Sequence, residues 1–250
     1  MMKSLNISRI FSIKEKNIIV VGGSRGIGKK IVNAFLNNRA RVINLSRTFV
    51  KSKNKNFFSI KCDISKTSEI RNSYKIIKKK FRKIDVIVNC SGITSTKNYP
   101  KFNFKNFKSI LELNLVSIFE LNSLLIPLLK KDSSIINISS IASYFGFENN
   151  PGYIASKSGL SGLTRSMAYD LSKKSIRVNN LVLGYIHTDM TKKSFESKKN
   201  YLIRKKRNLL NRWGTTNDII GASIFLASNA SSYITGSDIV VDGGWSIKGM

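Results

Sequence analysis

The chain has 250 residues, of which 42% are hydrophobic and 10% aromatic, so one α/β domain with a sizeable core is expected and a disordered chain is excluded. Three prolines and two cysteines exclude the collagen-like and disulfide-stapled classes. The 43 Lys and Arg residues against 14 Asp and Glu residues give a net charge of +29, and because His187 is the sole histidine we expect neither a His-based triad nor a metal site.

Short apolar runs rich in β-branched residues alternate with stretches of helical spacing along almost the whole chain. Seven such runs predict strands, at 17–21, 42–45, 57–62, 84–89, 135–139, 176–183 and 239–241. Helices are predicted from residue 27 and at 66–82, 104–130, 152–173 and 216–228. This alternation predicts right-handed βαβ units and hence an α/β fold, a single doubly wound domain over residues 1–250 with a mostly parallel seven-stranded sheet and helices on both faces.

The stretch 188–211 interrupts this alternation. It is polar, basic and irregular, and it follows the end of a strand, where ligands bind in such sheets. We therefore expect a substrate lid at about 188–211, because loops at strand ends often carry function. The alternative is a solvated helical excursion.

Three features bear on the location of the protein. Cys62 and Cys90 each end an apolar run and have no CxxC partner, so we interpret them as small buried hydrophobic residues in a reducing compartment. Residues 1–16 do not form a persuasive signal or transit peptide, and no apolar run reaches the roughly 18 residues that span a membrane. A soluble, cytoplasmic protein without a membrane partner is expected.

A glycine-rich turn follows the first predicted strand. It reads Gly22-Gly23-Ser24-Arg25-Gly26-Ile27-Gly28 and opens the first helix. Glycines permit a sharp turn and let backbone N–H groups approach a pyrophosphate at the helix N-terminus. The strand before this turn and the helix after it predict a dinucleotide site of the Rossmann type.

Three further motifs follow in chain order. Asn89-Cys90-Ser91-Gly92 follows the fourth predicted strand, Ser140 ends the fifth, and Tyr153-Ile154-Ala155-Ser156-Lys157 places Tyr and Lys on one face of a helix. With the glycine turn, these motifs resemble the classical short-chain dehydrogenase/reductase family, and the likeness covers residues 10–245. Within that family the chain is most similar to 3-oxoacyl-[acyl-carrier-protein] reductases and to sugar or polyol dehydrogenases. Val21 and Leu183 depart from the family pattern, which usually has Thr and Pro there.

The resemblance implies a catalytic tetrad of Asn114, Ser140, Tyr153 and Lys157. A free Tyr has a pKa of about 10, so a nearby ammonium is needed to favour its phenolate near neutral pH. Tyr153 is then expected to give a proton to the carbonyl oxygen during reduction and to remove it during oxidation. Ser140 is expected to hydrogen-bond that oxygen, Lys157 to bind the nicotinamide ribose, and Asn114 to hold a water of a proton relay.

The resemblance also implies the residues that hold the dinucleotide. Asp63 is expected to bind the adenine amino group, the 89–92 motif to support the adenosine side, and the 184–188 segment to meet the nicotinamide carboxamide. The full set is Gly22, Ser24, Arg25, Gly26, Ile27, Gly28, Ser46, Arg47, Asp63, Ile64, Asn89, Ser91, Gly92, Tyr153, Lys157, Gly184, Ile186 and Thr188. His187, inside the last segment, is expected to be a loop residue and not a catalyst.

The end of the second strand predicts the choice of cofactor. NAD enzymes place an acidic residue there for the ribose 2′-OH, whereas a nearby Arg accepts the 2′-phosphate of NADP. This chain has Ser46-Arg47, with Arg25 in the glycine turn. We therefore expect NADP(H), with NAD(H) as the second choice.

These features predict an NADP(H)-dependent oxidoreductase that interconverts a carbonyl and a secondary alcohol. The expected type is a 3-oxoacyl-[acyl-carrier-protein] reductase, and the alternative is a sugar or polyol dehydrogenase of the same family. The resemblance also implies a homotetramer. The apolar run 121–129 and the tail around Trp245 fit burial between its subunits, and the alternative is that either segment belongs to the chain's own core.

The basic charge suits an acidic carrier protein. The abundance of Lys, Asn, Ile and Phe favours AT-rich codons as its source, and the alternative is a site selected to bind a polyanion. A remote alternative is a nucleotide-binding regulator that contacts nucleic acid. The lysines are spread along the chain and no nucleic-acid motif is present, so a nucleic-acid partner is not expected.

Overall fold

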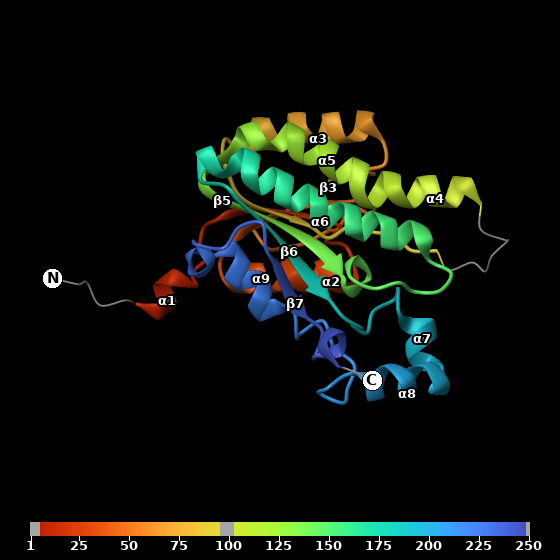
Figure 1. Cartoon of the computed structure of the whole chain (residues 1–250). Coiled ribbons are helices and arrows are strands. Elements are labelled where there is room, and N and C mark those ends of the chain that lie inside the picture. Colours follow the sequence, from red (N-terminus) through yellow and green to blue (C-terminus); the bar gives the residue numbers. More distant parts are fainter. Residues whose placement is uncertain (1–5, 96–102, 249–250) are drawn as a thin grey trace.

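The seven apolar runs form one sheet in the computed structural model, which describes residues 6–95 and 103–248 (Figure 1). The strands are β1 (Asn17–Val21), β2 (Arg41–Ser46), β3 (Phe57–Lys61), β4 (Ile84–Asn89), β5 (Leu129–Ser140), β6 (Arg177–Leu183) and β7 (Asp238–Val241). Their spatial order is β3-β2-β1-β4-β5-β6-β7, and every neighbouring pair is parallel. The predicted doubly wound α/β fold is therefore confirmed.

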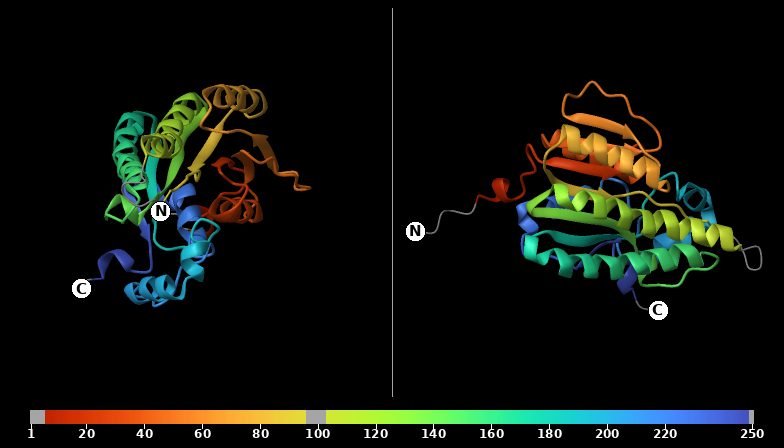
Figure 2. Two further views of the ribbon diagram at one scale, coloured as in Figure 1. Left: turned by 90° about the vertical axis from the view of Figure 1, so that its right-hand side faces the viewer. Right: turned by 90° about the horizontal axis from the view of Figure 1, so that it is seen from above.

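Helices cover both faces of this sheet. One face carries α3 (Thr67–Lys80), α4 (Phe104–Leu111), α5 (Ser117–Leu125) and α6 (Pro151–Leu171), which lie side by side in Figure 2. The other face carries α2 (Gly26–Asn37) and α9 (Ile220–Ala227) (Figure 1). The short helices α1 (Ile7–Ile10), α7 (Lys192–Glu196) and α8 (Lys198–Arg207) lie outside these two layers.

Alternation along each strand divides the core between the two faces of the sheet. Ile19 of β1 packs in one cluster with Leu121 of α5. Ile18, its neighbour in β1, packs in a second cluster with Phe35 of α2. Because both faces are covered, the strands are nearly continuous apolar runs in the sequence.

Two segments that were expected between subunits belong to the chain's own core. Leu121 and Leu125 are fully buried against the sheet, and Trp245 is 7% exposed in a cluster with Ile141 and Val182. These side chains are therefore not available to a second subunit, which is the intramolecular alternative that the sequence left open for both segments.

Two boundaries differ from the predicted ones by more than two residues. β5 begins at Leu129, inside the predicted helix 104–130, because Leu129 pairs with Ile84 of β4 and the pairing resumes at Ser134 after an irregularity. α9 begins at Ile220, since residues 216–219 form turns. The stretch 188–211 contains α7 and α8 and is largely helical.

One helical run joins α4 to α5 through a π-helical turn, Glu112–Val116, and ends in a 3-10 turn at Leu128. This run, Phe104–Leu128, has a mean hydropathy of 1.5, and by length and composition it is the one helix in the described part of the chain that could cross a membrane. Leu121 and Leu125 on it are fully buried against the sheet, as expected of a helix in a protein core.

The parallel arrangement gives the sheet two different edges. All strands end at one edge, which we call the carboxyl edge, and all begin at the other; in Figure 1 the arrowheads of β5 and β6 point away from α1. The chain winds outward from β1 to β3 on one side and from β4 to β7 on the other. Ligands of such sheets bind at the carboxyl edge where the order reverses, which here lies between β1 and β4.

Candidate active site

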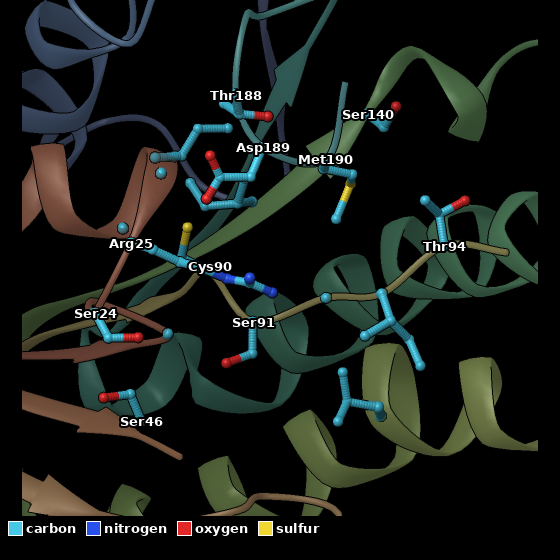
Figure 3. A pocket seen from close by; sticks show the side chains of 18 of the residues that line it. Ser24, Arg25, Ser46, Cys90, Ser91, Thr94, Ser140, Thr188, Asp189 and Met190 are labelled. Atoms are coloured by element: carbon cyan, nitrogen blue, oxygen red, sulfur yellow. The ribbon is translucent and has the colours of Figure 1, made fainter. Parts of the chain in front are cut away.

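A cavity of about 830 Å³ opens at the carboxyl edge of the sheet (Figure 3). The segments that follow β1 to β6 all contribute to its wall. Every residue predicted to hold the dinucleotide or to react lines this cavity, except Asn89 and Asn114. The fold thus brings together segments from residue 22 to residue 191.

The glycine turn provides an anion site on this wall. A Cβ at Gly28 would lie 2.2 Å from the carbonyl oxygen of Gly22, so the turn closes only with glycine there. Gly26 has a φ of +52°, and a Cβ on it would face open space, 4.0 Å from the Cβ of Thr188. No side chain caps the N-terminus of α2 at Arg25. The first N–H groups of α2 and the positive end of its dipole are therefore left for an anion.

Two arginines lie on the wall near this anion site. Arg25 and Arg47 are both exposed at the cavity, and Figure 3 shows the Arg25 side chain directed into it. Ser46 is buried, and its hydroxyl donates a 2.7 Å hydrogen bond to the carbonyl oxygen of Thr48. Ser46 occupies the position where NAD enzymes have an acidic residue, and its hydroxyl hydrogen is already used in this bond. The groups left to bind a phosphate are therefore the guanidinium groups of Arg25 and Arg47.

Asp63 lies on the same part of the wall, after β3. Its Oδ1 accepts hydrogen bonds from the N–H (3.1 Å) and the hydroxyl (2.8 Å) of Ser65. Burial acts to raise the pKa of Asp63, but the hydrogen bonds from Ser65 and the charge of Arg47 outweigh it and hold the pKa below its usual value. The carboxyl group is therefore ionised at neutral pH and can accept a hydrogen bond from a ligand.

Asn89 is not on the wall. Its side chain is 1% exposed, and its Nδ2 donates a 2.8 Å hydrogen bond to Oδ1 of Asn137. The chain of hydrogen bonds continues through Thr164 of α6 to Asn180 of β6. The Asn89 side chain therefore braces β4 beneath the cavity, and residues 90–94 after it line the wall.

Tyr153 and Ser140 meet on the wall. Tyr153 lies in the first turn of α6, and Ser140 is the last residue of β5. Burial raises the pKa of Tyr153, and a hydrogen bond with Ser140 offsets part of this effect. The Ser140 oxygen also accepts the N–H of Ala142 at 3.2 Å, which fixes it at the strand end. The two hydroxyl groups thus face the same space, an arrangement suited to binding a carbonyl oxygen.

Lys157 lies one helical turn after Tyr153. Its Nζ donates a 2.7 Å hydrogen bond to the carbonyl of Ile138 and lies 5.7 Å from the centre of the Tyr153 ring. Burial lowers the pKa of Lys157 to about 8. Lys157 therefore keeps most of its charge at neutral pH beside the phenol of Tyr153, whose own pKa is raised by burial.

Asn114 lies behind this group, in the π-helical turn. Its Oδ1 accepts the N–H of Ile93 at 2.8 Å, and its Nδ2 donates to the carbonyl of Ile93 (2.9 Å) and to the hydroxyl of Ser156 (3.1 Å). Both amide hydrogens are therefore used to tie the 90–95 segment to α6. π-Helical turns often occur at functional sites, and here the turn places the amide that holds the cavity wall.

The segment after β6 forms the opposite wall, and Gly184, Ile186 and Thr188 line it as predicted. Thr191 ties this segment together, because its hydroxyl accepts the N–H of Thr188 (2.9 Å) and donates to the carbonyl of Ile186 (2.7 Å). His187 is exposed, and its ring stacks on Phe195 of α7 at 3.8 Å between centroids. This placement fits the loop role predicted for it.

Sequence reasoning did not assign a set of residues that also line the wall: Thr48, Cys62, Cys90, Ile93, Thr94, Leu113, Ile138, Ser139, Leu183, Asp189, Met190 and Thr191. Burial raises the pKa of the Cys90 thiol to about 12, so it stays protonated. Thr94 pairs with Asn150, whose Nδ2 donates to the Thr94 hydroxyl at 2.8 Å. In Figure 3 Thr94 and Met190 lie on the same side of the cavity as Ser140, where a substrate would meet Tyr153.

α8 is fastened to the body of the protein by two arginines. The Arg204 guanidinium lies 4.8 Å from the centre of the Tyr185 ring, and that of Arg207 lies 4.4 Å from the Trp245 ring. Tyr185 belongs to the segment that lines the cavity through Gly184 and Ile186. The position of α8 is therefore linked to one wall of the cavity.

The residues present fit a nicotinamide dinucleotide. The uncapped N-terminus of α2 suits a pyrophosphate, and the open space above Gly26 admits one. Asp63 and the arginines lie at one end of the cavity, and Tyr153 lies with Lys157 at the other. No grouping of three or more His, Cys, Asp or Glu side chains that could hold a metal ion is found in residues 6–95 and 103–248.

Comparison with known proteins identifies relatives along nearly the full length. A family model described as enoyl-(acyl carrier protein) reductase matches residues 21–246. The 2-dehydro-3-deoxy-D-gluconate 5-dehydrogenase of Bacillus subtilis is 36% identical over 245 residues, which cover 94% of this chain and 96% of the relative. The 3-oxoacyl-[acyl-carrier-protein] reductase of Chlamydia trachomatis is 35% identical over 241 residues, with 92% and 96% covered. Among solved structures, the RhlG/NADP active-site complex of Pseudomonas aeruginosa has a TM-score of 0.86 at 25% identity, with 95% and 98% covered.

Proposed function

Since the chain belongs to the short-chain dehydrogenase/reductase family and is an oxidoreductase that acts on CH–OH groups, we propose that it reduces 3-oxoacyl groups carried by acyl carrier protein, with NADPH as cofactor. The observation that carries the reaction is the pair of hydroxyl groups of Tyr153 and Ser140 on the cavity wall, with Lys157 one helical turn after Tyr153.

Tyr153 acts in this proposal as the general acid. A bound nicotinamide dinucleotide supplies the hydride, and the chain's own task is to hold the carbonyl and provide the proton. Ser140 and Tyr153 both donate hydrogen bonds to the carbonyl oxygen, and the Tyr153 proton then passes to that oxygen as charge develops on it. In oxidation the same oxygen of Tyr153 takes the proton back.

Lys157 and Asn114 support this step. Because its pKa is about 8, the buried Lys157 is mostly an ammonium at neutral pH, and its charge favours the phenolate that Tyr153 becomes after it gives up the proton. In this proposal Lys157 also binds the nicotinamide ribose. Asn114 acts as a positioning residue, because its amide holds the 90–95 wall segment against α6.

NADP(H) is the proposed form of the cofactor, with NAD(H) as the second candidate. Arg25 and Arg47 line the end of the cavity nearest Ser46, and no carboxylate ends β2 to bind a ribose 2′-OH or to repel a phosphate. A 2′-phosphate would gain charge-assisted hydrogen bonds from these guanidinium groups. The structural relative from Pseudomonas aeruginosa binds NADP, which supports the same choice.

The proposed substrate is favoured by the apolar part of the wall. Ile93, Leu113 and Met190 lie around the space in front of Tyr153, and an acyl chain can bury itself against such side chains. A sugar or polyol is the second candidate. It is favoured by the Thr94–Asn150 pair, which can accept and donate hydrogen bonds to hydroxyl groups, and by the gluconate-type relative.

The proposed enzyme is a cytoplasmic homotetramer. Its two cysteines are free, as expected in a reducing compartment. Leu121 and Trp245 are used in the core. The exposed apolar side chains that support assembly are those of Val116 just before α5, Phe119 of α5 and Val240 of the edge strand β7. The segment from α7 to α8 is the proposed lid. Light scattering at micromolar concentration tests the assembly, and a monomer would contradict it.

NADPH oxidation measured over a panel of acyl thioesters, ketoses and cyclic ketones tests the function. We expect the highest kcat/KM with a 3-oxoacyl thioester, raised further when the acyl group is on acyl carrier protein. A preference for a ketose or keto sugar acid would overturn the substrate and leave the reaction type in place. Oxidation of NADPH by none of the carbonyls would overturn the proposed reaction itself.

A further inference from the structure

The fold gathers cations at the edge of the sheet opposite the cavity. Within three residues of the start of each strand from β1 to β6 lies a Lys or Arg that is exposed to solvent: Lys14, Arg41, Lys55, Lys83, Lys131 and Lys174. A second Lys or Arg stands within two residues of each of them. We call these six pairs the strand-start edge. They are scattered in the sequence and adjacent in the fold, because all strands are parallel.

The opposite edge does not share this excess. The described turns at the carboxyl edge, residues 22–25, 47–50, 62–66, 90–95, 141–150 and 184–191, hold three Lys or Arg and three Asp or Glu. At the strand-start edge the six pairs of cations stand against four carboxylates, those of Glu15, Asp85, Asp132 and Asp170. A codon bias alone would add Lys and Arg equally to the turns at both edges. It therefore does not account for the excess of cations at the strand-start edge.

Few of these cations are neutralised. Among the described residues, the ion pairs at this edge are Lys14–Glu15 at 3.7 Å and Lys130–Asp85 at 2.9 Å. Lys83, Lys131 and Lys174 have no ion-pair partner in the described part of the chain. Such unpaired, exposed charges of one sign create a positive potential that attracts polyanions.

The shape of the strand-start edge indicates which kind of polyanion fits it. The six strands are consecutive in the order β3-β2-β1-β4-β5-β6, so at about 4.8 Å per strand the pairs form a row roughly 24 Å long. A sheet twists by about 20–25° per strand, so the row turns by roughly 100° from end to end. A flat membrane meets part of such a row, whereas a flexible polymer can follow all of it.

From the charge and the shape together, we propose that the strand-start edge binds single-stranded nucleic acid through its phosphates. Lysine contacts to phosphate position a polymer without reading its bases, so the binding is independent of sequence. The cavity lies at the other edge of the sheet, so bound polymer leaves it open. The proposal is independent of the reaction proposed above.

The test is fluorescence anisotropy with a labelled oligo(dT) of about 20 nucleotides, longer than the ~4–16 nucleotides that a single-strand site covers. The edge variant carries Lys83→Gln, Lys131→Gln and Lys174→Gln. The matched control carries Lys198→Gln, Lys199→Gln and Lys206→Gln on α8 and loses the same charge. We measure the slope of log Kd against log salt concentration. Each phosphate contact contributes about 0.7 to this slope, so it should decrease by about 2 in the edge variant and stay unchanged in the control.

Three outcomes would overturn the proposal. Equal weakening in both variants would mean that net charge alone is responsible, and weaker binding in the α8 control would move the site to α8. Binding to phosphatidylserine vesicles without binding to oligo(dT) would indicate that the edge binds a membrane. Vesicles are included in the test because Ile7 and Phe11, before β1, are exposed apolar side chains. NADPH oxidation should be unchanged in the edge variant, which shows that the variant is folded and separates this test from that of the enzyme activity.

Discussion

The Nζ of Lys157 donates a 2.7 Å hydrogen bond to the main-chain carbonyl of Ile138, so the lysine of α6 is held directly on β5. A single carbonyl replaces only part of the hydration of an ammonium, and burial lowers the pKa of Lys157 from 10.5 to about 8. A buried lysine that releases its proton this early affects stability as well as chemistry.

We expect the stability of the protein to rise between pH 8 and 10.5 through Lys157. In that range the unfolded chain still holds the lysine proton and the folded chain has lost it, so the unfolded state binds more protons and the free energy of unfolding increases with pH. The full effect is on the order of 3 kcal/mol. Urea unfolding of wild type and Lys157→Met across this range measures it. The difference between the two should grow in favour of wild type, and a constant difference would contradict the argument.

Tyr153→Phe removes the proposed proton donor and keeps the ring. We expect reduction to fall by roughly 100-fold or more, the usual scale for a positioned general acid, with NADPH affinity unchanged. Tyr169→Phe is the matched control, because Tyr169 lies on the same helix and is 84% exposed. Steady-state kinetics and NADPH titration separate the two effects. Near-wild-type turnover in Tyr153→Phe would show that another group supplies the proton.

Arg47→Ala should distinguish the two nicotinamide cofactors. Loss of a charge-assisted hydrogen bond costs about 1.5–3 kcal/mol, so NADPH affinity should fall roughly ten- to a hundredfold while NADH affinity hardly changes. Lys51→Ala, on the same loop but off the cavity wall, controls for the loss of charge. Equal losses for both cofactors would mean that Arg47 supports the loop and does not bind the phosphate.

Ser46→Asp should move the preference toward NADH. The new carboxylate can accept hydrogen bonds from the ribose 2′-OH and repels a 2′-phosphate. Titration of both cofactors measures the ratio of affinities. A wild type that already prefers NADH would refute the assignment of NADP(H).

Thr164→Val should destabilise the protein by about 2–4 kcal/mol. The Thr164 hydroxyl accepts a 2.8 Å hydrogen bond from Asn137 and donates a 2.7 Å bond to Asn180, and all three side chains are fully buried. Valine has nearly the same shape but leaves two buried amide groups without this partner, each of which costs about 1–3 kcal/mol. Thr164→Ser keeps the hydroxyl and should lose about 1 kcal/mol. Similar losses in the two variants would mean that packing dominates.

Arg204→Ala with Arg207→Ala should loosen α8. Cation–π contacts such as those with Tyr185 and Trp245 stabilise by about 0.5–2 kcal/mol each. Amide hydrogen exchange in 198–207 should speed up, and the substrate KM should rise because Tyr185 belongs to the cavity segment. Lys198→Ala with Lys199→Ala removes the same charge from the same helix and should leave exchange unchanged. If amide exchange speeds up equally in both double variants, the contacts with the Tyr185 and Trp245 rings do not hold α8 in place.

Local patterns in the sequence were enough to predict the strands, the glycine turn and the Tyr153–Lys157 pair. β1 and β4 are buried on both faces, so nearly every residue in them is apolar and their bounds were predicted correctly. Tyr153 and Lys157 are four residues apart on one helix, a spacing that sequence alone fixes.

Features that depend on distant partners could not be predicted in this way. Residues 130–133 of β5 are polar and resemble a loop, and they lie within a strand because Leu129 and Ser134 on either side of them pair with β4. Asn89 was placed by its motif in the cavity, whereas Asn137 of a neighbouring strand draws its side chain into the core. Thr94 and Asn150 are far apart in sequence and pair because two loops meet over the cavity.

The π-helical turn Glu112–Val116 changes which side of one continuous helix faces the sheet. One residue of helix corresponds to about 100° of rotation, so the turn lets α4 face α6 while α5 faces α3. Deletion of a single residue between 112 and 116 would restore regular winding, rotate Leu121 and Leu125 away from the sheet, and withdraw Asn114 from Ile93. A related sequence one residue shorter in this stretch is therefore expected to lack the Asn114 clamp, and its length alone would reveal the loss.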